Sequence, residues 1–345
     1  MMTTPTQLEP DAARLAESAR KIRSPFELDL TLRFYSPQAN LDGMQHPQIA
    51  DWHRYIGEEW TPPPPPAGAR RVALLIPCTK YKPYSTSREH RAINRALLEA
   101  GWHPDGASTA PAELADYLDD GESPDLLHDG PLRRGDVFLD RFVLSEPMAI
   151  VPYSHICYWR DAPSPAACYD DPGLFEARGT SVSPERSDCT ATPLANGKWR
   201  WGPAERQAFA ETHNYLAGII RRCLVRLSPA YAEIGAWVSP GLTHRSFLAD
   251  DAFRRAEGLP RSRKGTAGPV KLVGVLEGAP GLVTMMPTQD HLEDARRRLA
   301  GRLEAEGRSA TPAAVRAVYA RGDGNDTPLG LPEALIHLTG WLDTA

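Results

Sequence analysis

Cysteine is scarce in this sequence of 345 residues. The five cysteines are scattered, odd in number and never arranged as a C-x-x-C pair. A disulfide framework needs paired cysteines, and structural zinc sites usually contain C-x-x-C pairs, so both are disfavoured. The cysteines therefore indicate a reducing compartment, and we expect a cytoplasmic protein without a bound metal.

Long apolar runs and an excess of positive charge are also missing. No stretch approaches the roughly 18 to 20 apolar residues that a membrane span needs, and residues 1–24 contain no apolar signal-peptide core. The formal net charge of -5 argues against a basic surface over the whole molecule, of the kind that binds nucleic acid non-specifically, but it leaves room for a local basic patch. We expect a protein that is neither secreted nor inserted in a membrane.

Proline, by contrast, is abundant, and one cluster marks a boundary. The run Pro62–Pro66 cannot continue a helix or a central strand. The chain is long enough for one large core or for two ordinary domains. We expect a lead-in over residues 1–66, a core over residues 67–250 and a C-terminal extension over residues 251–345.

Strand and helix patterns alternate through the expected core. Arg71–Pro77 is a short continuous apolar run, typical of a strand buried on both faces of a parallel sheet. Further strands are expected at Asp136–Leu144 and Glu233–Val238, and helices at residues 91–101 and Pro203–Leu227. This alternation predicts a doubly wound α/β sheet that binds ligands at the carboxyl ends of its strands.

The remaining segments are mostly helical in pattern. The helices expected outside the core cover Asp11–Lys21, Ile49–Glu59, Thr288–Glu306, Pro312–Tyr319 and Pro332–Leu342. Val270–Leu276 is expected to form a strand. Trp52 and Tyr55 fit packing better than a base-stacking platform, because helical spacing places them on one face. The charge run Arg296–Arg298 fits a solvated helix face.

Chemically active side chains are concentrated in the segment Cys78–His90, directly after the first buried strand. It contains a thiol, lysines, tyrosines, several hydroxyl groups and a histidine. The dipole of the following helix and the charge of Lys80 or Lys82 can lower the pKa of Cys78 and make its thiolate a nucleophile. Alternatively, Cys78 is a small buried apolar residue at the strand end.

Other residues of this segment also have two interpretations. Lys82 precedes a proline, which favours an extended backbone and presents the side chain at a fixed angle to an anion or a carbonyl group. Ser87 fits the N-cap of the following helix as well as a catalytic role. His90 can act as a general acid or base, or it can simply hydrogen-bond the loop.

The sequence PCTKYKPYSTSREH at residues 77–90 resembles the archaeosine synthase family. Its pattern is Pro-Cys, three residues, Lys-Pro-Tyr, two residues, Ser, two residues, His. The preceding HPQIADWHRYIGEEWTPPPP resembles the family's lead-in, and LSEPMAIVP, ACYDDPG and WGPAERQAF resemble later family segments. The similarity covers residues 44–248. We recognise neither the family's transglycosylase-like domain nor its RNA-binding domain, which predicts a stand-alone relative.

Archaeosine synthase adds the side-chain amine of lysine to the nitrile of 7-cyano-7-deazaguanine in tRNA. The resemblance implies a similar amine addition, without a cofactor, to a deazaguanine-like nucleobase, nucleoside or tRNA residue. In that scheme the candidate catalytic residues are Cys78, Lys82 and His90, with Cys78 as nucleophile and His90 as proton shuttle. The family is similar in fold to uracil-DNA glycosylases, which implies a three-layer α/β/α fold with a mainly parallel central sheet.

Residues from several loops are candidates for substrate binding. They are Tyr84, Ser87, Ser145, Glu146, Tyr169, Asp170, His244 and Arg245. The loop Ser145–Pro152 follows the second strand and could line the same pocket as Cys78, together with Tyr153 and His155. The loop Ser239–Ser246 follows the third strand, where a doubly wound sheet binds ligands, so His244 and Arg245 suit a carboxylate or phosphate.

Two other functions stay open. A non-catalytic nucleotide or nucleic-acid-binding module predicts a basic groove with exposed aromatic residues and a buried Cys78. An N-glycosidase acting on a modified base needs a carboxylate near the pocket, for which Glu146 and Asp170 are the candidates. Catalysis by amine addition predicts instead that Cys78, Lys82 and His90 converge in one pocket.

Overall fold

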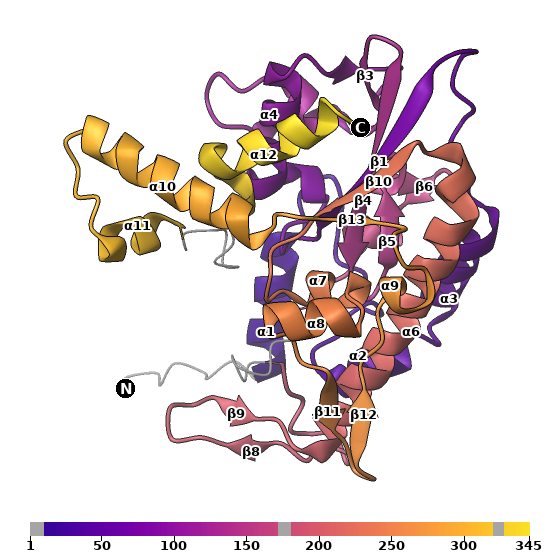
Figure 1. Ribbon diagram of the computed structural model, residues 1–345. Helices are drawn as coiled ribbons and strands as arrows, with labels where there is room; N and C mark the ends of the chain where they lie inside the picture. The colour runs from indigo at the N-terminus through magenta and orange to yellow at the C-terminus, as the bar shows by residue number, and fades with distance from the viewer. Residues whose placement is uncertain (1–9, 172–180, 320–327) are drawn as a thin grey trace, which may run out of the picture.

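The computed structural model describes residues 10–171, 181–319 and 328–345. Its centre is a seven-stranded sheet with the order β13-β10-β1-β4-β3-β2, in which β5 also pairs with β4 (Figure 1). The strands of this sheet are β1 (Arg70–Pro77), β2 (His103–Pro104), β3 (Leu132–Arg134), β4 (Val137–Ser145), β5 (Ala149–Pro152), β10 (Glu233–Trp237) and β13 (Thr284–Met286).

The middle of the sheet is parallel and one side is antiparallel. Strands β13, β10, β1 and β4 run in the same direction, whereas β3 and β5 run antiparallel to β4. The loop expected at Ser145–Pro152 therefore contains a strand. A connection as short as Glu146 to Met148 can join only antiparallel neighbours, so β5 folds back along β4 as a hairpin.

Strand β1 shows why its sequence is continuously apolar. Every residue from Arg71 to Pro77 is buried, as expected for the middle of a sheet covered on both faces. Arg71 donates hydrogen bonds to Asp140 at 2.6 Å and to the carbonyl of Pro63 at 2.7 Å. The one charge in the buried part of the strand is thus paired with a carboxylate.

Helices lie on both sides of the sheet, as the α/β prediction requires. The helices are α1 (Pro10–Lys21), α2 (Pro37–Gly43), α3 (Pro47–Arg54), α4 (Arg88–Glu99), α5 (Pro165–Cys168), α6 (Pro203–Leu227), α7 (Thr243–Leu248), α8 (Asp251–Glu257), α9 (Val275–Gly278), α10 (Gln289–Ala305), α11 (Pro312–Tyr319) and α12 (Pro332–Leu342). Helices α4 and α12 pack together on one side, and α6 and α3 lie on the other (Figure 1). The α/β class is confirmed, while the likeness to uracil-DNA glycosylase stays a prediction.

In the part of the chain that the structure describes, three small antiparallel ribbons lie outside the main sheet. They pair β6 (Tyr158–Trp159) with β7 (Ala162–Pro163), β8 (Thr192–Pro193) with β9 (Trp199–Arg200), and β11 (Ser262–Lys264) with β12 (Pro269–Lys271). The strand expected at Val270–Leu276 was therefore wrong in most of its length. Strand β12 ends at Lys271, and Gly274, where a Cβ would overlap the backbone of Ala249, is the N-cap of α9.

The loop expected at Ser239–Ser246 is also shorter than predicted. Helix α7 begins at Thr243, and its second half is anchored by Phe247 and Leu248, which are buried in the core. Short helices of this kind carry too little periodicity to stand out in a sequence. The consequence for function is that His244 and Arg245 project from a helix rather than from a loop.

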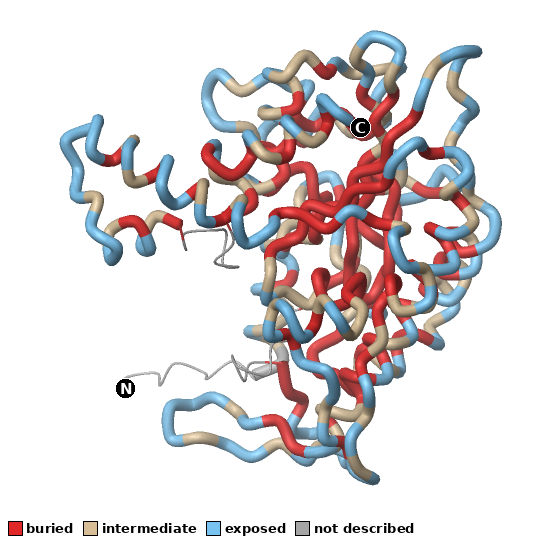
Figure 2. Tube along the Cα trace, in the orientation of Figure 1, coloured by how far each residue is buried: buried red, intermediate tan, exposed pale blue. Residues whose placement is uncertain are grey.

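Residues of all three expected units contribute to one hydrophobic core. It includes Ile22 and Trp52 from the lead-in, Leu75 from β1, and Leu299 and Leu338 from the C-terminal segment. The buried residues form a continuous band from the sheet into the surrounding helices (Figure 2). The unit boundaries themselves stay predictions. Among the residues that the structure describes, no helix has both the length and the apolar content of a membrane span.

Candidate active site

The site begins where the parallel strands β1 and β4 end side by side. Pro77, the last residue of β1, lies opposite Leu144 of β4. The next residue, Cys78, donates its backbone N–H to the carbonyl of Leu144 at 2.8 Å. Cys78 and Ser145 are therefore neighbours at the carboxyl edge of the sheet, where α/β folds place their ligands.

Helix α7 places a histidine against the thiol of Cys78. The helix follows β10, the neighbour of β1 on its other side, and Nε2 of His244 lies 3.2 Å from Sγ of Cys78. His244 is buried, and its Nδ1 has no hydrogen-bond partner among the described residues. Cys78 itself is only partly buried. The pair resembles a nucleophile beside a base.

Burial sets the protonation of this pair. It raises the pKa of the Cys78 thiol to about 12, with Lys82 opposing the shift, and it lowers the pKa of His244 to about 4. At neutral pH the pair is thus a thiol and a neutral imidazole. The expected lowering of the pKa of Cys78 was wrong, because burial outweighs the charge of Lys82.

Three buried hydroxyl groups meet behind the thiol. Tyr84 donates to Oγ of Ser145 at 3.1 Å, and the hydroxyl of Tyr169 lies 2.6 Å from Ser145 and 3.0 Å from Tyr84. Burial raises the pKa of both tyrosines, so both keep their protons. This hydroxyl cluster, Tyr84, Ser145 and Tyr169, ties the segment after β1 to the end of β4 and to the segment after α5.

Lys82 is a buried cation beside this hydroxyl cluster. Its Nζ lies 4.3 Å from the centre of the Tyr169 ring and 4.0 Å from Oδ1 of Asp170. Asp170 also accepts hydrogen bonds from Ser18 at 2.6 Å and from Lys21 at 3.0 Å. Burial lowers the pKa of Lys82 and the charge of Asp170 opposes that shift. The carboxylate of Asp170 is therefore engaged in holding two lysines.

Two further carboxyl groups affect the thiol electrostatically. Glu146 follows directly after β4, and both its charge and that of Asp171 raise the pKa of Cys78. Burial, together with the neighbouring charge of Asp171, raises the pKa of Glu146 well above its ordinary value. Glu146 has no side-chain hydrogen bond within the described segments, whereas Asp171 accepts one from Asn40 at 3.2 Å. Glu146 is thus a buried acid that keeps its proton.

His90 lies close to the site but does not face the thiol. Its Nε2 lies 2.8 Å from the carbonyl of Pro77, and its Nδ1 lies 2.7 Å from the hydroxyl of Tyr153. Burial lowers its pKa to about 4, so the neutral ring donates from Nε2 and accepts at Nδ1. Ser87 accepts the backbone N–H of His90 at 3.2 Å, which confirms its role as N-cap of α4.

Arg245 is fully engaged in structural bonds. Its Nε donates to Glu257 at 2.9 Å, and its Nη1 donates to the carbonyls of Val238 and Met286 at 3.2 Å and 3.0 Å. The structure thus gathers most of the predicted residues and leaves Arg245 outside. The residues brought together are Cys78, Lys82, Tyr84, Ser145, Glu146, Tyr169, Asp170 and His244, with Ser87 and His90 directly behind them.

Two residues near the site were not predicted. Asp171 could have been found, because it adjoins Asp170 in ACYDDPG. Asn40 carries no signal in the sequence, since it comes from α2 of the lead-in. Tyr153 and His155 instead line a separate pocket of about 360 Å³, whose lining includes neither Cys78 nor Ser145.

The site contains no obvious place for a metal ion. Within the described ranges, no cluster of three or more histidine, cysteine, aspartate or glutamate side chains could hold one. The groups that this site supplies are a thiol, an adjacent neutral imidazole and a protonated carboxyl group. These three groups suit nucleophilic attack on a carbon atom whose heteroatom must gain a proton.

Comparison with known proteins gives one local similarity. No family model matches this chain, and no solved structure matches it. A segment of 57 residues is 39% identical to archaeosine synthase subunit alpha of Thermococcus kodakarensis. This segment is 16% of the present chain, and the match spans only 9% of that relative. The similarity supports a relation between parts of the two proteins.

Proposed function

We propose that this protein adds an amine, such as the side chain of lysine, to the nitrile of a 7-cyano-7-deazaguanine-type base, nucleoside or tRNA residue. The observation that carries the proposal is the 3.2 Å approach of Nε2 of His244 to Sγ of Cys78 at the carboxyl edge of the sheet. The local similarity to archaeosine synthase subunit alpha supports the choice of substrate.

In the first step the thiol of Cys78 adds to the nitrile. Sγ bonds to the nitrile carbon while Nε2 of His244 takes the thiol proton, so that no free thiolate accumulates. One of the two π bonds of the nitrile becomes a lone pair on nitrogen. That nitrogen takes the proton of the Glu146 carboxyl group, whose raised pKa keeps it available at neutral pH. The product is a neutral thioimidate on Cys78.

In the second step the amine displaces the sulfur. The amine nitrogen bonds to the thioimidate carbon, the carbon–sulfur bond breaks, and the sulfur recovers its proton from His244. The added nitrogen gives its extra proton to the Glu146 carboxylate. The amidine leaves, and Cys78, His244 and Glu146 return to their starting protonation states.

The remaining residues position this machinery. The hydroxyl cluster fixes Ser145 beside Cys78, and Lys82 supplies a positive charge that favours charge build-up on the sulfur. His90 fixes the carbonyl of Pro77, the residue directly before the nucleophile. In this scheme His90 is a positioning residue and His244 makes the proton transfer.

Mass spectrometry can test both steps separately. Incubation with 7-cyano-7-deazaguanine, free or in tRNA, should give a thioimidate on the intact protein without an amine and an amidine product when lysine is added. Cys78→Ala should abolish both, whereas Cys189→Ala removes another partly exposed thiol and should change neither. The absence of any mass gain with every amine donor tried would sink the proposal.

A second candidate function is hydrolysis of an N-glycosidic bond. It is favoured by the two carboxyl groups, Glu146 and Asp171, that act on the thiol of Cys78. A pair of nearby carboxyl groups is the usual equipment for glycosidic hydrolysis. Liberation of a free base from a deazaguanine nucleoside without any amine, lost in Glu146→Gln but kept in Cys78→Ala, would favour hydrolysis over amine addition.

A further inference from the structure

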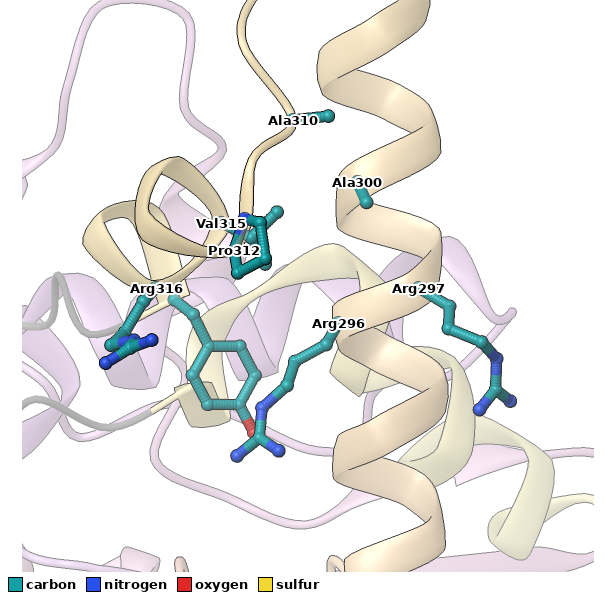
Figure 3. Close-up of a pocket in the computed structure, with 8 residues that line it drawn as sticks. Arg296, Arg297, Ala300, Ala310, Pro312, Val315 and Arg316 are labelled. Carbon is teal, nitrogen blue, oxygen red and sulfur yellow. The ribbon is translucent and has the colours of Figure 1, made fainter.

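A pocket of about 590 Å³ opens between α10 and α11, the two helices that project from the body of the molecule (Figures 1 and 3). Its floor is formed by small apolar residues, including Ala300 and Val315, and its rim carries three arginines, Arg296, Arg297 and Arg316. The site described above involves neither helix. The pocket therefore needs an explanation of its own.

The three arginines differ in how their charges are partnered among the described residues. Arg296 of α10 and Arg316 of α11 both line the pocket, whereas Arg297 points to the other side of α10 (Figure 3). Arg297 pairs with Asp294 at 2.9 Å. Within the described ranges, neither Arg296 nor Arg316 forms an ion pair.

Arg296 is also held in place before any ligand arrives. Its guanidinium lies 4.8 Å from the centre of the Tyr319 ring, and Tyr319 is buried at the end of α11. An arginine stacked on an aromatic ring loses less conformational entropy when it binds an anion.

We propose that this pocket binds a phosphate group of a nucleotide, either a free nucleotide or one within an RNA strand. The planar fork of arginine matches phosphate oxygens in a bidentate manner. The apolar floor formed by Ala300 and Val315 accepts the ring of a base or the face of a ribose. The inference is independent of the amine addition, because it rests on residues far from Cys78 in the sequence.

Binding measurements with defined probes test the pocket. Titration calorimetry measures the binding of adenosine 5′-monophosphate, inorganic phosphate and adenosine. Fluorescence anisotropy measures the binding of a labelled 12-nucleotide single-stranded RNA. Together the two measurements separate the sources of the phosphate. Arg316→Gln and Arg296→Gln should each weaken binding about tenfold or more, as expected for the loss of a charge-assisted contact. Tighter binding of the RNA assigns the pocket to a strand, and binding of the mononucleotide alone assigns it to a free ligand.

Arg298→Gln is the matched control. Arg298 lies on the same helix and pairs with Asp294, but it does not line the pocket. Its replacement changes the net charge of the protein by the same amount as Arg316→Gln. Binding to this variant should stay within about twofold of the parent, because exposed charges away from a contact act weakly. The proposal is overturned if Arg298→Gln weakens binding as much as Arg316→Gln, if adenosine binds as well as its monophosphate, or if no phosphate probe binds.

Discussion

At the scale of single residues, Asp170 is a structural anchor. Asp170→Asn would leave Lys82 buried without its ion-pair partner and weaken the hold on Lys21. We expect the free energy of unfolding to fall by about 3 to 5 kcal/mol, as for other broken buried pairs, measured by urea denaturation. Asp188→Asn removes an exposed partner of Arg186 and should cost far less. Equal losses in the two variants would show that Asp170 is not an anchor.

Single residues also show what the sequence could and could not predict. Cys78 was placed correctly because an apolar run followed by polar residues predicts the end of a buried strand. Because ligands bind at the carboxyl ends of parallel strands, His244 was expected at the same edge of the sheet. Only the fold shows that its ring contacts the thiol of Cys78, from which it is separated by 166 positions in the sequence. The direction of the pKa shift of Cys78 was mispredicted, because charges can be read from a sequence whereas the depth of burial cannot.

At the scale of helices, α10 depends on its N-cap residue, Thr288. The side chain of Thr288 accepts the backbone N–H of His291 at 3.2 Å, and Nδ1 of His291 accepts the N–H of Thr288 at 3.3 Å. Thr288→Ala should lower the free energy of unfolding by about 1 kcal/mol, and Thr288→Asp should restore it. Urea denaturation of both variants is the measurement, and an unchanged midpoint in Thr288→Ala would contradict the cap.

Strand β10 and helix α12 fit together through one glycine. A Cβ atom at Gly235 would overlap the ring of Trp341. Gly235→Ala should therefore destabilise the protein by about 1 to 3 kcal/mol, the usual cost of overpacking, and Trp341→Ala in the same chain should relieve the clash. Gly340→Ala is the control, since a Cβ there meets no atom, and it should leave thermal unfolding unchanged or raise its midpoint.

The accuracy with which the helices and strands named below could be predicted depended on their length. Helices α6 and α10 and strand β4 were predicted within a few residues, because each is long enough to show a clear period. Helix α7 and strand β5 are short, and each owes its form to its place in the fold. Because α7 carries His244, the weakest part of the prediction coincided with the candidate site.

At the scale of the whole molecule, packing in the hydrophobic core brings together the segments that form the candidate site. Its residues come from the segment after β1, the end of β4, α7 and the segment after α5, and the lead-in adds Ser18, Lys21 and Asn40. Those segments are joined by one hydrophobic core that also includes the C-terminal helices. The geometry at Cys78 therefore depends on packing throughout the chain, which is why a local motif alone did not determine it.

The burial of four histidines predicts how the free energy of unfolding changes as the pH falls. Burial lowers the pKa of His53, His90 and His244 to about 4 and that of His213 to about 3. In the unfolded chain each titrates near pH 6.5, so between that pH and 4 the unfolded state binds more protons and stability falls as pH falls. From pH 7 to pH 5 the free energy of unfolding should drop by on the order of 2 kcal/mol for each histidine.

Urea denaturation at pH 7, 6 and 5 measures this loss. His213→Gln removes one of the buried rings and should make the decline shallower, because one fewer proton is taken up on unfolding. His103→Gln alters an exposed histidine in β2 and should leave the slope as it is. Equal stability at pH 7 and pH 5 would mean that the four rings are not held neutral by the core, and the neutral His244 on which the first proton transfer depends would lose its physical basis.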